Sequence, residues 1–131
     1  MICIGFAALL CLIGFAGCAQ DENTMEITYQ QITAQEAKAI MDSEINHVII
    51  DARTEEEFAA GHIANAILMP EYEVAERAEA ELPNKDALIL VYCRSGRRSK
   101  IAASELVKLG YTNVKEFGGI IDWPYETTTE E

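Results

Sequence analysis

Short apolar segments alternate with amphipathic segments through most of this chain. The apolar segments have the length of buried strands, and the intervening segments carry apolar residues at helical spacing or are rich in helix-forming residues. The predicted strands cover residues 26–32, 48–50, 67–69, 87–91 and 114–117. The predicted helices cover residues 33–42, 54–60, 71–82 and 99–109. Strands that alternate with helices predict a single α/β domain with a mainly parallel sheet of about five strands.

Capping signals mark the ends of two predicted helices. Thr33 and Glu36 have the spacing of a capping box, which begins a helix by satisfying its first free N–H groups. Thr54 and Glu57 repeat the same pattern. Gly61 follows the second helix and is expected to be its C-cap.

The first 17 residues contain no charge and consist mainly of apolar and small side chains. This composition is typical of the hydrophobic region of a signal peptide. The segment resembles a bacterial lipoprotein signal, in which Cys18 would be lipidated and would anchor the protein at the periplasmic or extracellular face of the cell envelope. Plain secretion and a retained membrane span are the alternatives. Residues 18–26 then form a linker, residues 27–125 the domain and residues 126–131 an acidic tail that is expected to fray.

Charge and cysteine content exclude several functions. The net charge of −12 argues against binding nucleic acid or an anionic membrane through charge, so a membrane partner is expected only through the lipid anchor. With Cys3 and Cys11 in the signal segment and Cys18 lipidated, Cys93 is the one free thiol that remains. There is then no disulfide framework and no second cysteine for thioredoxin-like chemistry. The two histidines lie far apart in the sequence, so a Cys/His zinc site is not supported. No metal and no cofactor are predicted.

Cys93 stands where the fourth predicted strand ends, shortly before the last predicted helix. Backbone N–H groups at such a turn point into one small space, and a helix N-terminus adds positive potential. The turn also carries cations, namely Arg94, Arg97, Arg98 and Lys100. These features favour a thiolate and attract anionic substrates. A buried structural cysteine beside a solvated cationic turn is the alternative, but it requires neither convergent amides nor cations.

Polar residues also follow the second predicted strand. Asp51 and Arg53 stand at its C-terminal end, the sheet edge where ligands bind in open parallel folds. A structural role is preferred for both, with Asp51 bonded to loop backbone and Arg53 to a carboxylate. His62 is expected to form hydrogen bonds in the core or in a loop, and a catalytic base is its alternative role. Trp123 is expected to pack in the core after a flexible turn at residues 118–119.

Three motifs in order along the chain resemble the single-domain rhodaneses, a thiosulfate:cyanide sulfurtransferase-like family. The motifs are Ile50-Asp51-Ala52-Arg53 continuing through Glu57-Phe58, Gly61-His62-Ile63 and Ala66 to Pro70, then Tyr92-Cys93-Arg94-Ser95-Gly96-Arg97-Arg98-Ser99, then Gly118-Gly119-Ile120-Ile121-Asp122-Trp123. The resemblance covers roughly residues 27–125 and implies the rhodanese fold, with helices on both faces of the sheet. It implies that Cys93 is the catalytic nucleophile. The implied substrate-binding residues are Arg94, Ser95, Gly96, Arg97, Arg98 and Ser99.

We therefore expect a thiosulfate sulfurtransferase. Cys93 would take the sulfane sulfur of thiosulfate or a similar small anion, become a persulfide and pass the sulfur to a thiol, cyanide or protein acceptor. A persulfide carrier or sensor without turnover, or an interaction module, is the alternative.

A Cys-based phosphatase is a third possible function. The length of the loop between the cysteine and its arginine distinguishes it from a sulfurtransferase. Such enzymes have the spacing Cys-x5-Arg, whereas Arg98 gives this chain Cys-x4-Arg and Ser99 holds the phosphatase arginine position. The shorter loop predicts sulfur transfer and no meaningful hydrolysis of aryl phosphates.

Overall fold

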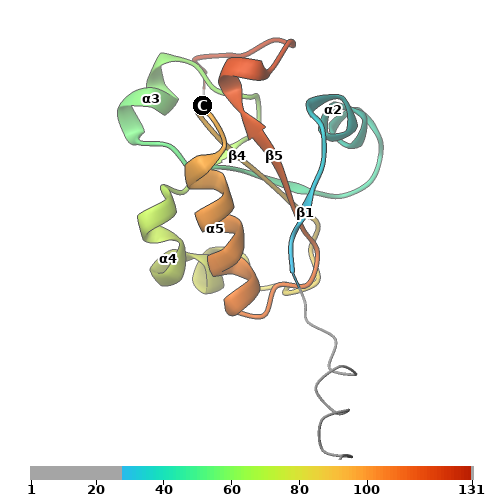
Figure 1. Ribbon diagram of the computed structural model, residues 1–131, viewed down its shortest axis with the longest axis vertical. Coiled ribbons are helices and arrows are strands. Elements are labelled where there is room, and N and C mark those ends of the chain that lie inside the picture. Colours follow the sequence, from blue (N-terminus) through green and yellow to red (C-terminus); the bar gives the residue numbers. More distant parts are fainter. Residues whose placement is uncertain (1–27, 131) are drawn as a thin grey trace, which may run out of the picture.

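The computed structural model describes residues 28–130, which form alternating strands and helices around one sheet (Figure 1). The strands are β1 (Gln30–Gln31), β2 (Val48–Asp51), β3 (Ile67–Leu68), β4 (Ile89–Cys93) and β5 (Val114–Gly119). The α-helices are α2 (Ala34–Asp42), α3 (Glu55–Ala60), α4 (Val74–Glu81) and α5 (Arg97–Lys108). Two short 3-10 helices complete the fold, η1 (Glu71–Glu73) and η2 (Ile120–Asp122).

The five strands form one sheet in the order β1-β5-β4-β2-β3, and each neighbouring pair is parallel. The predicted fold class is therefore confirmed. Because all strands run the same way, their C-terminal ends meet at one edge of the sheet. β4 is central, and its five residues are all buried, as expected for a strand covered on both faces.

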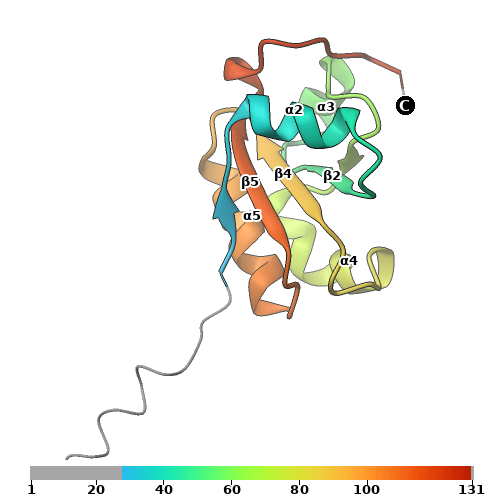
Figure 2. The same ribbon diagram turned by 90° about the vertical axis from the view of Figure 1, so that its right-hand side faces the viewer.

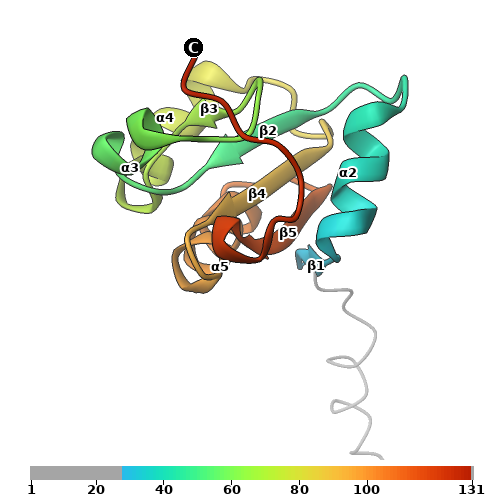
Figure 3. The same ribbon diagram turned by 90° about the horizontal axis from the view of Figure 1, so that it is seen from above.

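Helices cover both faces of the sheet. Figure 2 shows α2 in front of the strands, with α4 and α5 behind them, and Figure 3 shows the same separation from above. Successive β4 side chains point to opposite faces. Ile89, Val91 and Cys93 pack in the core between the sheet and α4 and α5. Leu90 and Tyr92 pack in the second core, which includes Ala37 of α2.

The two predicted capping boxes are present. The Thr33 hydroxyl accepts from the Glu36 amide at 3.0 Å, and the Glu36 carboxylate accepts from the Thr33 amide at 2.9 Å. Thr54 and Glu57 form the same reciprocal pair at the start of α3, and Gly61 is the C-cap of that helix. The sequence therefore predicts where both helices begin.

Several expected boundaries are wrong: the first strand is only Gln30–Gln31, the fourth strand continues through Cys93, and the segment 71–82 is divided into η1 and α4. Two further differences lie beside Cys93. α5 begins at Arg97 rather than at residue 99, so the turn after Cys93 is shorter than expected. Residues 118–119 are not a flexible turn, because β5 continues through Gly119 and pairs there with Cys93. Trp123 does pack in the core, against Phe117, as expected.

The described part of the C-terminal tail is also ordered rather than frayed. Thr128 pairs antiparallel with His62, donating its N–H to the His62 carbonyl at 2.7 Å and accepting from the His62 amide at 2.8 Å. The tail thus lies against the loop that follows α3.

The predicted signal segment, Cys18 and the linker through residue 26 lie outside the described residues. Within residues 28–130, no helix is long and apolar enough to span a bilayer.

Candidate active site

Cys93 is the last residue of β4 and lies at the C-terminal edge of the sheet. Its side chain is 1% exposed and packs on the face covered by α4 and α5. The Gly96 amide donates a hydrogen bond to the Cys93 Sγ at 2.9 Å. Because the acceptor is the sulfur itself, this N–H points at the atom that would act as the nucleophile.

Glycines let the Cys93 loop lie directly on the end of β5. Gly96 has a φ of 109°, a backbone conformation that other residues rarely adopt, and it is the N-cap of α5. A Cβ on Gly119 would lie 2.0 Å from the Arg94 carbonyl oxygen and 2.5 Å from the Ser95 Cα. The Ile121 amide donates to the same Arg94 carbonyl at 3.2 Å. β5 and η2 therefore hold the backbone of the loop in place.

A buried carboxylate supports the loop from beneath. Glu116 is 1% exposed and accepts from the Ser99 hydroxyl at 2.5 Å and from the Gly118 amide at 3.0 Å. The Gln31 side-chain amide is a third donor, at 3.2 Å. The Ser99 hydroxyl also lies 3.1 Å from the Gly96 carbonyl oxygen. Hydrogen bonds thus connect Glu116 to the residue whose amide contacts the sulfur.

Arg98 is held by a carboxylate of α3. Its guanidinium donates to both oxygens of Glu57, at 2.8 and 2.9 Å, in a bidentate pair. The hydrogen bonds from Arg98 are the main reason that the pKa of Glu57 falls from its usual 4.5 to about 2. The same pairing with Glu57 raises the pKa of Arg98. Arg98 therefore lies near the Cys93 loop, and its positive charge is already paired with the Glu57 carboxylate.

The other loop residues differ in exposure. Arg94, Ser95 and Arg97 are exposed, and neither arginine pairs with a carboxylate of residues 28–130. Ser99 is buried, and its hydroxyl is bonded to Glu116, so this side chain does not face the solvent. The six residues expected to bind substrate therefore include two surface arginines with no carboxylate partner in the described part of the chain, while Arg98 and Ser99 have partners within the fold.

Asp51 and Arg53 form a closed pair at the end of β2. The Arg53 guanidinium donates to the Asp51 carboxylate at 2.7 Å and to the Gly61 carbonyl at 2.7 Å. The Tyr92 hydroxyl donates to Asp51 at 2.6 Å and accepts from the Ile63 amide at 3.0 Å. Burial and the negative charge of Asp51 raise the pKa of Tyr92 well above its usual value, so the phenol stays protonated. All these contacts are within the fold, as a structural role requires.

His62 is buried, and both of its ring nitrogens face backbone carbonyls. Nδ1 lies 2.8 Å from the Phe58 oxygen and Nε2 lies 2.9 Å from the Glu130 oxygen. The ring also stacks on Phe58, with centroids 3.6 Å apart. These contacts fit the expected hydrogen-bonding role rather than that of a catalytic base.

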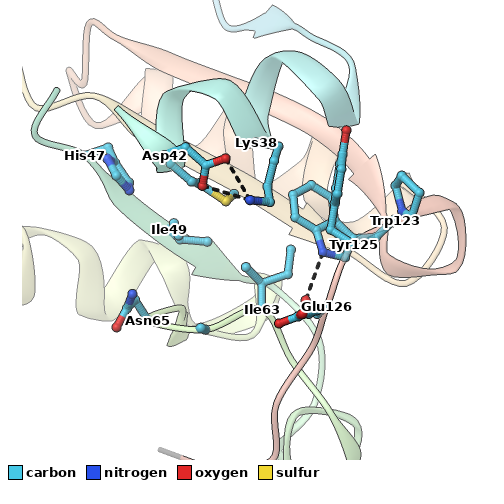
Figure 4. Close-up of a pocket in the computed structure, with 12 residues that line it drawn as sticks. Lys38, Asp42, His47, Ile49, Ile63, Asn65, Trp123, Tyr125 and Glu126 are labelled. Atoms are coloured by element: carbon cyan, nitrogen blue, oxygen red, sulfur yellow. Dashed lines mark hydrogen bonds and ion pairs between the residues drawn. The ribbon is translucent and has the colours of Figure 1, made fainter. Parts of the chain in front are cut away.

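A separate pocket of about 770 Å³ opens on the α2 face of the sheet (Figure 4). Its lining includes Ile49 and Trp123, which belong to the core on that face, and it does not include Cys93. At the pocket, the Lys38 ammonium and the Asp42 carboxylate form an ion pair with each other (Figure 4). The pocket is therefore not part of the cysteine site.

Three site residues were missed by sequence reasoning. The sequence predicts Glu57 only as a helix cap, because its pairing with Arg98 joins residues 41 positions apart and leaves no local signal. It predicts a turn at Gly119, although two adjacent glycines can also indicate a close backbone approach. Side chains alternate between the two faces of a strand, so Glu116 lies on the same face of β5 as buried Val114. This alternation is the signal that predicts a buried carboxylate at position 116. No cluster of three potential metal ligands occurs within residues 28–130.

Similar proteins are consistent with this geometry. The rhodanese-like domain family matches residues 33–124. The thiosulfate sulfurtransferase PspE of Escherichia coli is 40% identical over 73 residues, which cover 56% of this chain and 70% of PspE. The adenylyltransferase and sulfurtransferase UBA4 of Candida albicans is 33% identical over 100 residues, which cover 71% of this chain but only 23% of UBA4.

The fold is similar to that of a solved structure as well. The rhodanese-like domain of a protein from Anabaena sp. matches with a TM-score of 0.72 and 27% identity, over 79% of this chain and 81% of that structure. Together with the family match to residues 33–124, this places the chain in the rhodanese-like domain family.

Proposed function

We propose that the protein is a thiosulfate sulfurtransferase that works through a persulfide on Cys93. Sulfur transfer as the general role is supported by the family and by relatives named as sulfurtransferases. The observation that carries the proposal is the contact of the Gly96 amide with the Cys93 sulfur, beside surface arginines that pair with no carboxylate of residues 28–130. A thiolate beneath a cationic surface suits attack on an anionic donor.

In the first half-reaction, the Cys93 thiolate attacks the outer sulfur of thiosulfate. A bond forms between Sγ and that sulfur, the S–S bond of thiosulfate breaks, and its electron pair leaves with sulfite. The enzyme retains a persulfide anion, so the total charge is unchanged. The Gly96 amide stabilises negative charge at the site, while Arg94 and Arg97 attract the dianionic donor.

In the second half-reaction, an acceptor nucleophile attacks the outer sulfur of the persulfide. The new bond joins this sulfur to the acceptor, the bond to Sγ breaks, and Cys93 returns as a thiolate. Cyanide accepts the sulfur as thiocyanate, and a thiol accepts it as a new persulfide. The sulfane sulfur is transferred without a change in its oxidation state, so neither half-reaction needs a cofactor.

Phosphate ester hydrolysis is the rival that the loop disfavours. Position 99 is a serine whose hydroxyl is bonded to Glu116, and Arg98 is bonded to Glu57, so neither side chain is free to surround a phosphate. We expect no phosphatase activity above that of the Cys93→Ser variant.

Steady-state kinetics with thiosulfate and cyanide test the proposal. We expect ping-pong kinetics, because sulfite leaves before the acceptor binds. The Cys93→Ser variant should fold normally but lose sulfur transfer by at least about 10³-fold, since serine lacks a nucleophilic thiolate. A wild-type protein that forms the persulfide without turnover would instead be a carrier, and faster hydrolysis of aryl phosphates than sulfur transfer would make it a phosphatase.

We also propose that the protein is exported and anchored to a bacterial membrane through lipidated Cys18, since the uncharged apolar segment before it has the composition of a signal peptide. Expression in a bacterium with labelled fatty acid tests this proposal. The wild-type protein should carry the label and the Cys18→Ala variant should not. Cytoplasmic protein with Met1 retained would contradict export.

A further inference from the structure

Most cations of this acidic protein are neutralised within the fold, but three of the four cations that follow Cys93 have no carboxylate partner among residues 28–130. Six of its ten Lys and Arg side chains form ion pairs with carboxylates of residues 28–130. The four without such a partner are Arg94, Arg97, Lys100 and Lys115. Three of these four follow Cys93 within seven positions, so unpaired positive charge is concentrated beside the candidate nucleophile.

Two exposed isoleucines accompany these cations. Ile121, on η2, is 57% exposed, and its amide is bonded to the Arg94 carbonyl. Ile101 is 40% exposed and lies four positions after Arg97 on α5, on the same side of the helix. Figure 1 shows η2 above the first turn of α5. Apolar side chains at these positions contribute nothing to binding a small dianion.

Lys100 and Ile101 extend this surface along α5, away from the Cys93 loop. Lys100 lies three residues after Arg97, or roughly 5 Å further along the helix axis. A small dianion at Cys93 could be reached by long Arg and Lys side chains, but it would leave the two exposed isoleucines without a contact. A ligand that contacts the whole surface needs several residues of its own.

Carboxylates beside this surface limit where an acidic ligand can lie. Glu55 and Glu56 are exposed on α3, next to the Glu57 that binds Arg98. Asp122 is exposed next to Ile121. An acidic ligand is therefore repelled from α3 and directed over the first turns of α5, which gives it one preferred orientation.

From these observations, we infer that Arg94, Arg97, Lys100, Ile101 and Ile121 form a docking surface for an acidic protein segment that presents a cysteine thiol. Charge complementarity identifies the occupant, because acidic side chains would pair with the three cations and apolar ones with the two isoleucines. This inference rests on the proposed sulfurtransferase function and names the class of its sulfur acceptor.

The docked thiol would receive the sulfur without any further reactant. The acceptor thiol loses its proton, its sulfur attacks the outer sulfur of the Cys93 persulfide, and the bond from that sulfur to Sγ breaks. The acceptor leaves as a persulfide that carries the hydrogen, and Cys93 returns as a thiolate. Charge and atoms balance, since a persulfide anion and a thiol become a thiolate and a persulfide.

Two blocked synthetic peptides test the docking surface. One has a single Cys between Glu and Leu residues, and the other has Gln in place of each Glu. We expect kcat/KM for sulfur transfer to be at least about tenfold higher for the acidic peptide, with the advantage falling as salt concentration rises. Fluorescently labelled peptides with Ser for Cys report binding separately from chemistry.

The structure offers matched controls. Ile121→Ser should weaken binding of the acidic peptide at least about threefold and leave thiosulfate:cyanide turnover unchanged, because the substitution keeps the amide that is bonded to the Arg94 carbonyl. Lys100→Gln should also weaken binding of the acidic peptide at least about threefold. Ile45, which is 55% exposed and precedes β2 at the opposite edge of the sheet, provides the control Ile45→Ser. Lys115→Gln is the control for charge. Neither control should change peptide binding.

The outcomes separate the two proposals. Equal binding of the two peptides, no binding of either, or an equal effect of Ile45→Ser and Ile121→Ser would overturn the docking surface even if thiosulfate turnover is fast. If the protein does not turn over thiosulfate, the sulfurtransferase proposal is wrong. The peptide-binding measurement then tests the docking surface by itself.

Discussion

β2 and β4 end side by side, and the charged side chains at their two ends differ in burial and in pairing. β2 ends in Asp51, which pairs in register with Tyr92 of β4, one residue before Cys93. At the end of β2, the Asp51 carboxylate accepts from the Arg53 guanidinium and the Tyr92 hydroxyl, and all three side chains are buried. At the end of β4, Cys93 receives one amide contact, and exposed arginines follow it.

The difference separates structural from functional charge at one sheet edge. Buried charges remain only where the fold supplies partners for them, and the Asp51 network is complete in this sense. The cations after Cys93 lie at the surface, where water solvates them until an anion binds. We infer that the β2 end supports the fold and that the β4 end serves the chemistry. Four substitutions test this division.

Gly119→Ala should have the largest effect, and on activity. Its Cβ would lie 2.0 Å from the Arg94 carbonyl oxygen, so the backbone of the Cys93 loop must move. Displacement of reacting groups by about 1 Å can cost roughly 100-fold in rate, and we expect a loss of that order in thiosulfate kcat/KM. The far-UV circular dichroism spectrum should remain that of the wild type. Full activity in a folded Gly119→Ala protein would show that the loop does not depend on this close contact.

Glu116→Ala should reduce both activity and stability. The change leaves the Gly118 amide without its acceptor and the buried Ser99 hydroxyl with only its longer contact to the Gly96 carbonyl, at a cost of about 1–3 kcal/mol in unfolding free energy. Because Ser99 also contacts the Gly96 carbonyl, we expect kcat to fall roughly tenfold as the Gly96 amide shifts from the sulfur. Glu116→Gln keeps the shape and one acceptor oxygen and should restore most of the rate. If the alanine variant is as active as the wild type, Glu116 acts on stability alone.

Tyr92→Phe should affect stability but not chemistry. Removal of the hydroxyl breaks a 2.6 Å hydrogen bond to Asp51 and a 3.0 Å bond from the Ile63 amide. We expect the free energy of unfolding to fall by about 1–3 kcal/mol in urea titrations. Thiosulfate kcat/KM should stay within about twofold of the wild-type value. A large loss of activity in the folded variant would mean that the β2 end belongs to the active site after all.

Glu57→Gln should have the smallest effect, of about 1 kcal/mol or less, since this ion pair is only partly buried. Its pH dependence is more informative than its size. Glu57 has a lowered pKa of about 2 in the folded protein, so its contribution is complete above the unfolded pKa of about 4.5. The contribution is lost as pH falls from about 4.5 toward 2. The difference in unfolding free energy between the two proteins should shrink over this range, and a constant difference would contradict the pairing with Arg98.

The sequence predicts the helix starts and the location of Cys93 better than the side-chain contacts that hold the Cys93 site in place. Both capping boxes and the position of Cys93 at a strand end follow from spacing that is local in the chain. The pairing of Arg98 with Glu57 and of Ser99 with Glu116 depends on tertiary packing, which no local pattern encodes. The His62–Thr128 contact was missed for the same reason, because a short acidic tail gives no signal for the segment it will pair with.

The most direct test of the central claim is the mass of the intact protein after brief exposure to thiosulfate. We predict a gain of one sulfur atom, located by peptide mapping to Cys93, and loss of that sulfur on adding cyanide at a rate no slower than kcat. The Cys93→Ser variant should show no gain. Turnover of thiosulfate without sulfur on Cys93, or a sulfur adduct that cyanide removes far more slowly than the enzyme turns over, would contradict the account.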